Sequence, residues 1–398
     1  MSAVEGEVDG LLLEQGEYMP LELLLQTGRL MYSDYEAWRR GELPYLDQAL
    51  FGDPGQVLEM LARAEAYLER RGWQAEPLSY RPWGGQTANA APLRFSANAA
   101  LDVCFHRRYR RPHDQPQLDL FTDSPGTALQ NGVLQALEER HAASARRGLQ
   151  RLYEVAPDSP RLGALERLTE ALEAVDRPVE DVAAELTRLE EKLTPLADEL
   201  LGTGSRNLLI PLWRRLSAAL QESAFDPARP RLHLSYSAAR SLDWDIVQQA
   251  VEREPSWRRH SVLLERFAVA AERRHELNRA LPAWFTLCWR FPDRAAAIGG
   301  SANRMLSDGW SAFQDRDVAL PPPAFPAWLL VQRPALTKSL PEPDDCPDSY
   351  ATLYRLQRRH DGQPPDQDVL ALRARLREQD PLLFDAYMAV LKGGSAFG

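Results

Sequence analysis

Residues 145–172 read ARRGLQRLYEVAPDSPRLGALERLTEAL and contain two apolar stripes separated by one turn. On each side of the turn the apolar residues lie three or four positions apart: Ala145, Leu149 and Leu152, then Leu162, Leu165, Leu168 and Leu172. This spacing places each set on one face of a helix. The intervening segment 156–160, APDSP, supplies prolines and small polar residues that end one helix and begin the next. The stretch therefore predicts a helix pair and an all-α fold.

A longer apolar seam follows on the C-terminal side of this pair. After Pro178 it alternates steps of three and four: Val179, Val182, Leu186, Leu189, Leu193, Leu196 and Leu200. This is the a/d pattern of a coiled coil over about three heptads. Pro195 interrupts the seam, because proline removes a helical hydrogen bond. A buried helix in a bundle is therefore favoured over a coiled coil that binds a partner.

Capping residues divide much of the remaining chain into further predicted helices. Two short helices are expected over residues 20–41, with Trp38 as a core residue of the second. This pair also fits a DNA-binding helix-turn-helix, but its connection from Gly28 to Ser33 is longer than that motif uses, so a helical hairpin is preferred. The other predicted helices are one opened by Asp53-Pro54, one from Ser96 to about Arg108, three at 237–254, 259–274 and 276–291, and three beginning near Asp348, Asp366 and Asp380.

Other stretches do not have the spacing of a helix. Residues 73–95 and 320–348 are rich in proline, with glycine in the first and acidic residues in the second, and are predicted to be a long loop and a linker. The alternation of Leu232, Leu234 and Tyr236 predicts a single short strand.

A weak internal repeat supports stacked helices. Pro282-Ala283-Trp284 is repeated as Pro326-Ala327-Trp328, about 44 residues later, which is a period expected of helical repeats. Pro211-Leu212-Trp213 is a looser third copy. We expect each proline in the first turn of a helix and each tryptophan in the groove between neighbouring helices.

The residues of 145–160, with apolar positions before a proline-bounded turn, resemble the second helix and closing proline of a tetratricopeptide repeat. The resemblance implies antiparallel helix pairs stacked into an irregular α-α solenoid, although the regular period of 34 residues is absent. The predicted parts are an N-terminal helical module with its loop at 1–95, a helical-repeat region at 96–223, a second one at 224–320, and a linker with C-terminal helices at 321–398.

Composition limits where the protein acts and what it binds. Of 398 residues, 47 are basic and 57 acidic, and the net charge of −10 does not favour nucleic acid over the whole surface. The three cysteines lie far apart, which argues against a disulfide framework and a structural zinc site and favours a reducing cytoplasm. No leader or membrane-spanning segment is expected, since the longest apolar runs fall short of about 20 residues. The abundance of alanine, leucine and arginine indicates a bacterium with a GC-rich genome.

No recognisable catalytic, cofactor or metal site emerges from the sequence. The seven histidines have no metal-ligand spacing, and Gly202-Thr203-Gly204-Ser205 lacks the lysine of a phosphate-binding loop. An enzyme of unfamiliar type is kept as a third hypothesis, with the loop 73–95 and Cys104-His106 near its site. Cys104 lies between Val103 and Phe105, which favours a buried structural thiol.

The pentapeptide Gln117-Leu118-Asp119-Leu120-Phe121 resembles the motif by which bacterial replication and repair proteins dock onto the DNA polymerase sliding clamp. The resemblance implies an extended segment that inserts Leu120 and Phe121 into an apolar pocket, while Gln117 hydrogen-bonds at its rim. Prolines on both sides favour an extended conformation. The alternative is that these apolar residues hold an inter-helix linker on the core.

A basic segment directly precedes this motif and includes Arg107, Arg108, Tyr109, Arg110 and Arg111. Arginines contact phosphates and an interleaved tyrosine stacks on bases, so the segment is a candidate nucleic-acid site. The alternative, which the acidic composition favours, is that the arginines bind helix-terminal carbonyls or acidic residues of the protein itself.

These observations predict a cytoplasmic bacterial scaffold or adaptor whose helical-repeat surface binds partner proteins. The second hypothesis is a DNA-transaction accessory factor that docks on the sliding clamp.

Overall fold

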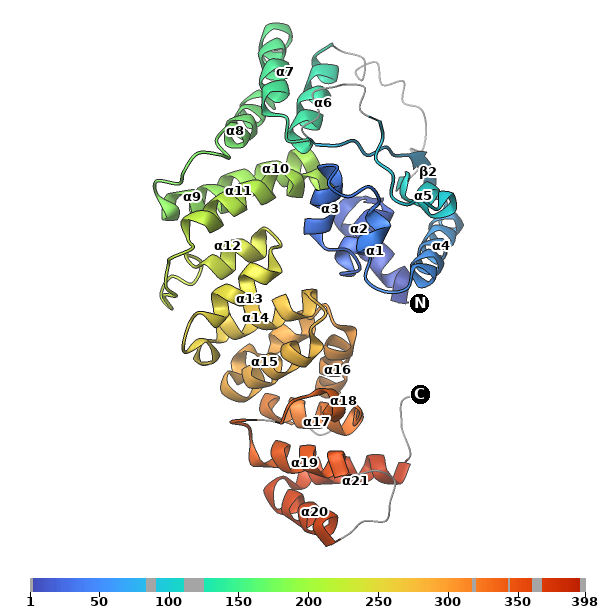
Figure 1. Ribbon diagram of the computed structural model, residues 1–398, viewed down its shortest axis with the longest axis vertical. Helices are drawn as coiled ribbons and strands as arrows, with labels where there is room; N and C mark the ends of the chain where they lie inside the picture. Colours follow the sequence, from blue (N-terminus) through green and yellow to red (C-terminus); the bar gives the residue numbers. More distant parts are fainter. Residues whose placement is uncertain are drawn as a thin grey trace. The chain divides into compact units, whose positions relative to one another are not determined.

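We describe a computed structural model over residues 3–83, 91–110, 125–316, 320–342, 344–359 and 367–393. Within these ranges the chain is dominated by helices that pack on their neighbours in sequence, so the all-α prediction is confirmed (Figure 1). The chain divides into two compact units, Met1–Ser223 with Arg240–Asp243 and Ala224–Ala239 with Trp244–Gly398. The division into four parts stays a prediction.

Unit 1 begins with a helical module around an aromatic core. Its helices are α1 (Ala3–Gln15), α2 (Pro20–Gln26), α3 (Tyr32–Arg39), α4 (Pro54–Arg70) and α5 (Ala99–Phe105), with the 3-10 turn η1 (Leu46–Ala49). The predicted pair over 20–41 is present as α2 and α3. Trp38 is fully buried and its indole N–H donates to the Arg94 carbonyl, as expected of a core residue.

A small sheet in this module corrects two predictions. Strands β1 (Glu17–Tyr18), β3 (Arg107–Arg110) and β2 (Gln74–Pro77) pair antiparallel in the order β1-β3-β2. The helix predicted to reach Arg108 ends at Phe105, and the predicted loop 73–95 contains a strand. The strands have only two to four residues, and their partners are distant in sequence. No local alternation of apolar and polar residues therefore predicts them.

The second part of unit 1 is a run of helices that pack consecutively. They are α6 (Pro125–Glu138), α7 (Ala142–Val155), α8 (Leu162–Glu173), α9 (Val182–Arg188), α10 (Thr194–Leu201) and α11 (Ser205–Ala219), with the 3-10 turn η3 (Gly202–Gly204) before α11. The helix pair predicted from residues 145–172 is present as α7 and α8. Every residue of its two apolar stripes is buried.

A π-helical turn, η2 (Leu189–Leu193), joins α9 to α10 and ends the predicted heptad seam. Up to the end of the turn the seam positions Leu186, Leu189 and Leu193 are buried. After it, Ala197 and Leu201 are buried in place of Leu196 and Leu200. A π turn accommodates one extra residue, so the buried face moves by one position. The helix is an internal element of unit 1, as the preferred interpretation held.

Unit 2 continues with short helices around a second core. Its elements are α12 (Leu234–Arg240), α13 (Trp244–Glu252), η4 (Trp257–Arg259), α14 (Ser261–Arg273), α15 (Leu277–Arg290), η5 (Pro292–Gly300), α16 (Arg304–Gln314), η6 (Pro322–Ala324), α17 (Phe325–Gln332), α18 (Leu336–Ser339), α19 (Asp348–Arg359), α20 (Gln367–Gln379) and α21 (Pro381–Gly393). Arg240, the last residue of α12, belongs to unit 1. The final three helices match their predicted starts.

Four expectations about the helices are wrong. The predicted linker 320–348 contains η6, α17 and α18, and Phe325 and Leu330 within it are fully buried. The predicted strand at Leu232–Tyr236 is the start of α12, where the His233 ring accepts the Ser235 N–H. The helix predicted over 237–254 is two helices, because Leu242 has a φ of 60° and breaks it. Pro282 and Pro211 lie inside α15 and α11, whereas Pro326 alone of the three lies in a first turn. The three associated tryptophans are buried as expected.

Candidate functional site

The predicted clamp-docking motif Gln117, Leu118, Asp119, Leu120 and Phe121 lies outside the described residues, as does Arg111. The described chain stops at Arg110 in strand β3 and resumes at Pro125, the first residue of α6. Docking on a sliding clamp therefore stays a prediction from sequence.

The other residues of the basic segment form the central strand of the small sheet. Arg108 pairs with Glu76 at 2.9 Å, and Arg110 pairs with Glu17 at 2.7 Å. Both acids belong to the strands flanking β3, so these arginines have partners within the protein. Tyr109 is fully buried and packs edge-on against Tyr18 with ring centroids 5.9 Å apart. Nucleic-acid binding by this segment stays a prediction, but Tyr109 is not available for the base stacking it includes.

Cys104 and His106, the candidate pair for an unfamiliar enzyme, make separate contacts. The Cys104 thiol donates to the Ala100 carbonyl at 3.3 Å, and His106 Nδ1 lies 3.1 Å from the Leu78 carbonyl. Burial raises the pKa of the Cys104 thiol, which disfavours the thiolate needed for nucleophilic attack. The geometry does not form a nucleophile–base pair.

A serine, a histidine and a glutamate come together in unit 2 without a signal in the sequence. His233 Nδ1 lies 2.8 Å from Ser235 Oγ, and its Nε2 lies 3.5 Å from Glu254 Oε1. Arg266 also donates to Ser235 Oγ at 2.9 Å. Ser235 has no exposed surface and His233 is 2% exposed, so no substrate reaches the hydroxyl. The group fixes the start of α12 and is not a catalytic site.

Within the described residues no cluster of histidine, cysteine and acidic side chains is arranged to hold a metal ion. No helix in those ranges has the length and apolar character needed to cross a bilayer.

A buried charged cluster joins the N-terminal module to the later helices of unit 1. Glu36 of α3 is 1% exposed and pairs with Arg140, whose Nη2 lies 2.8 Å from Oε1, and with Arg214 of α11. Arg140 also stacks over the Trp83 ring at 4.1 Å. Arg214 reaches Asp243 as well, at 2.8 Å. Each buried charge has an opposite charge beside it, which is the condition for burying ions without a large penalty.

Pro211 contributes to this cluster because its missing N–H leaves a backbone carbonyl free to accept another hydrogen bond. Because proline has no N–H, the carbonyl four residues earlier, on Asn207, has no helical donor. The Arg140 Nε donates to that carbonyl at 2.6 Å, and the Asn207 side chain accepts from Tyr32 at 2.8 Å. The interior proline thus creates an acceptor for Arg140, which lies in the turn between α6 and α7.

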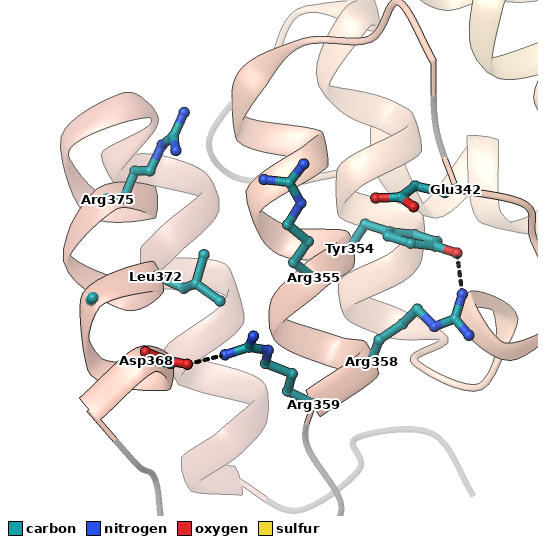
Figure 2. A pocket seen from close by; sticks show the side chains of 9 residues that line it. Glu342, Tyr354, Arg355, Arg358, Arg359, Asp368, Leu372 and Arg375 are labelled. Atoms are coloured by element: carbon teal, nitrogen blue, oxygen red, sulfur yellow. Dashed lines mark hydrogen bonds and ion pairs between the residues drawn. The ribbon is translucent and has the colours of Figure 1, made fainter.

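The accessible site with the most distinctive chemistry is a pocket of about 580 Å³ on helices α19 and α20 of unit 2 (Figure 2). Four arginines make the lining basic, and Ala371 and Leu372 add apolar surface. The lining residues are Glu342, Tyr354, Arg355, Arg358, Arg359, Asp368, Ala371, Leu372 and Arg375. We call it the arginine pocket. Its volume is in the range of ordinary ligand sites.

The arginines of this pocket differ in how they are held. Arg359 pairs with Asp368 at 2.7 Å, and Arg358 donates to the Tyr354 hydroxyl at 2.9 Å. Arg355 and Arg375 have no acidic partner among the described residues; Arg375 Nε lies 3.1 Å from the Gln379 side-chain amide. In Figure 2 these two side chains extend from facing helices toward the same end of the groove. These two guanidinium groups form no ion pair with a described residue, although Glu342 also lines the pocket.

Sequence analysis did not identify the arginine pocket. Helices α19 and α20 carry six arginines against three acidic residues, a local excess that is visible in the sequence of an acidic protein. Which of these arginines face one another depends on how the two helices pack, and sequence spacing within one helix does not specify this.

Comparisons with protein-family models, curated proteins and solved structures find no match for this chain. Function is therefore inferred from its own residues.

Proposed function

We propose that the protein is a cytoplasmic bacterial scaffold or adaptor that binds partner proteins on the outer faces of its stacked helices. The observation that supports this most is the arginine pocket. It is an open, ligand-sized site with charged side chains, and it lacks a nucleophile, a metal cluster or a thiol within the described residues. Its arginines suit the binding of an anionic group of a partner.

The consecutive packing of helices supports the same proposal. Helices such as α7 bury one stripe on their neighbours and leave the opposite face in solvent, an arrangement that helical-repeat proteins use to bind peptides. On α7 the side chains of Tyr153 and Val155 are 42% and 51% exposed, respectively, although both are apolar or aromatic. Exposed apolar side chains on a repeat surface favour protein contacts.

Site-specific cross-linking in the native host tests the proposal. A photoreactive amino acid at Tyr153 is expected to capture a defined partner, which mass spectrometry identifies. The matched control places the same amino acid at Glu199, an exposed acidic position on α10. Turnover of a small molecule by the purified chain, with no partner captured from any exposed helix, would contradict a scaffold function.

The second candidate is docking on the DNA polymerase sliding clamp, which the match at residues 117–121 supports. Replacing Leu120 and Phe121 by alanine is expected to abolish binding to purified clamp, measured by surface plasmon resonance, without changing the melting temperature. Thr122→Ala is the control and is expected to bind normally. A sharp fall in melting temperature with Leu120→Ala/Phe121→Ala would instead assign the segment to the core.

A further inference from the structure

We infer that the arginine pocket is the binding site for an acidic peptide segment of a partner protein, one in which Asp or Glu residues flank an apolar side chain. This inference rests on the proposed function, since it names the chemistry of the partner. It begins with the charge: Arg355 and Arg375 face the same end of the groove and have no acidic partner among the described residues (Figure 2).

Carboxylates suit these two arginines because guanidinium groups bind carboxylates through paired, charge-assisted hydrogen bonds. The protein carries a net charge of −10, so a locally basic pocket is not a consequence of its composition. A free guanidinium there attracts an anionic ligand, while the acidic remainder of the surface disfavours long polyanions.

The spacing of the arginines favours a peptide over a compact phosphate. Arg355 projects from α19 and Arg375 from α20, whereas Arg359 is already paired with Asp368. Basic groups spread along a groove match negative charges spread along a chain. Among the described residues, the lining includes no glycine-rich loop whose backbone N–H groups would cradle a phosphate.

The floor of the pocket explains why the ligand includes an apolar residue. Leu372 is partly buried and points from α20 toward α19 in Figure 2. Tyr354 is 2% exposed and its hydroxyl donates to the Leu340 carbonyl, so its ring is fixed and is not available to stack on a base. An aliphatic side chain between two carboxylates is complementary to this floor.

The acidic residues of the lining also select against nucleic acid. Asp368 and Glu342 are both exposed at the pocket. A continuous phosphate backbone would pass close to these carboxylates, and like charges oppose binding. A short peptide places its few carboxylates only beside the arginines.

The test is fluorescence anisotropy with the full chain and a short fluorescein-labelled peptide in which Asp and Glu flank leucine. Wild type is expected to bind it, and the peptide with Asn and Gln in place of the acids is expected to bind at least about tenfold more weakly. Arg355→Gln and Arg375→Gln are each expected to weaken binding by about tenfold, since each removes a charge-assisted hydrogen bond. Binding is also expected to weaken between about 0.05 and 0.3 M salt.

Arg377→Gln is the matched control, because Arg377 lies on the same helix but does not line the pocket and packs over Phe384. It is expected to bind the acidic peptide as wild type does, and circular dichroism checks that all variants are folded. Equal binding of the acidic and amide peptides, or no effect of Arg355→Gln and Arg375→Gln, would overturn the inference. Tighter binding of a single-stranded oligonucleotide or of inorganic phosphate at these arginines would also overturn it.

The outcomes separate this inference from the proposed function. A partner that is cross-linked equally by wild type and by Arg355→Glu/Arg375→Glu supports a scaffold and refutes the acidic-peptide site. Peptide binding at the arginines with no partner captured in the host supports the site and refutes the scaffold.

Discussion

At the scale of a residue, Glu36 shows how this protein buries charge. It lies in the core of unit 1 between Arg140 and Arg214. Glu36→Gln removes the negative charge and leaves two guanidinium groups without their shared partner. We expect it to lower the free energy of unfolding by about 3 kcal/mol or more, the usual result of breaking a buried ion pair.

Urea denaturation followed by circular dichroism measures this effect. Glu42→Gln is the control, because Glu42 is 57% exposed and pairs with Arg40 on the surface. Its expected effect on stability is much smaller, because solvent screens an exposed ion pair. Equal destabilisation by the two variants would mean that the buried cluster contributes no more than a surface pair.

Glu138 of α6 is a partly buried carboxyl that is expected to respond to pH. Burial raises its pKa to about 7, while nearby Arg39 opposes the rise. The native state therefore favours the protonated form, and its contribution to stability is full below the unfolded pKa and is lost as pH rises through about 7. Glu138→Gln mimics the protonated form.

We expect Glu138→Gln to be more stable than wild type at pH 8.5 by about 1–3 kcal/mol and to match it near pH 5. Denaturation in urea at both pH values measures the difference, and Glu199→Gln on exposed α10 is the control. A gain of the same size at both pH values would exclude ionisation as its cause.

At the scale of an element, α11 shows how one proline alters the contacts of a helix. Pro211 leaves the Asn207 carbonyl to Arg140. Pro211→Ala restores a helical N–H that competes for the same carbonyl. In a double-mutant cycle with Arg140→Gln, we expect a coupling free energy of about 0.5–2 kcal/mol.

The control cycle pairs Arg140→Gln with Pro282→Ala, the interior proline of α15. These two changes share no partner and are expected to be additive within about 0.5 kcal/mol. Additivity in both cycles would show that the hydrogen bond between Arg140 and the Asn207 carbonyl does not depend on Pro211.

Elements with strong local periodicity were predictable from sequence, and those made by distant contacts were not. The α7–α8 pair was predicted because its stripes and its proline turn lie within one segment. The α1 helix was missed because its apolar residues form no clear stripe. The β3 strand was read as the end of a helix because its partners lie at residues 17–18 and 74–77.

The same distinction holds for the candidate site. The arginines of α19 and α20 could be counted in the sequence, but their convergence depends on the packing of the two helices. The predicted basic segment 107–111 was found by composition, whereas its pairing with Glu17 and Glu76 required the sheet.

At the scale of the whole molecule, the two units are expected to respond to pH in opposite directions. Burial lowers the pKa of His233 in unit 2, with Glu254 opposing and Arg266 adding to the effect. The native state thus favours neutral histidine, and stability is lost as pH falls below the unfolded pKa of about 6.5. Glu138 in unit 1 has the reverse dependence.

Hydrogen exchange with mass spectrometry, corrected for intrinsic rates, measures this at pH 5.5 and 8.5. Protection of α11 in unit 1 is expected to fall at the higher pH, and protection of α12 and α14 in unit 2 to fall at the lower. Glu138→Gln should remove the first trend only, and His233→Asn the second only. The same direction of change in both units would contradict the assignment of these two groups.

The π turn at Leu189–Leu193 has a consequence for altering this chain. That turn holds one residue more than a regular α-helix needs, so removing Glu191 leaves enough backbone for a continuous helix. The deletion also places Ala197 and Leu201 on the same helix face as Leu186 and Leu189. Pro195 would then interrupt a regular helix interior. A one-residue deletion within Leu189–Leu193 is therefore the length change that the surrounding helices tolerate best, and Pro195 limits how regular the resulting helix can be.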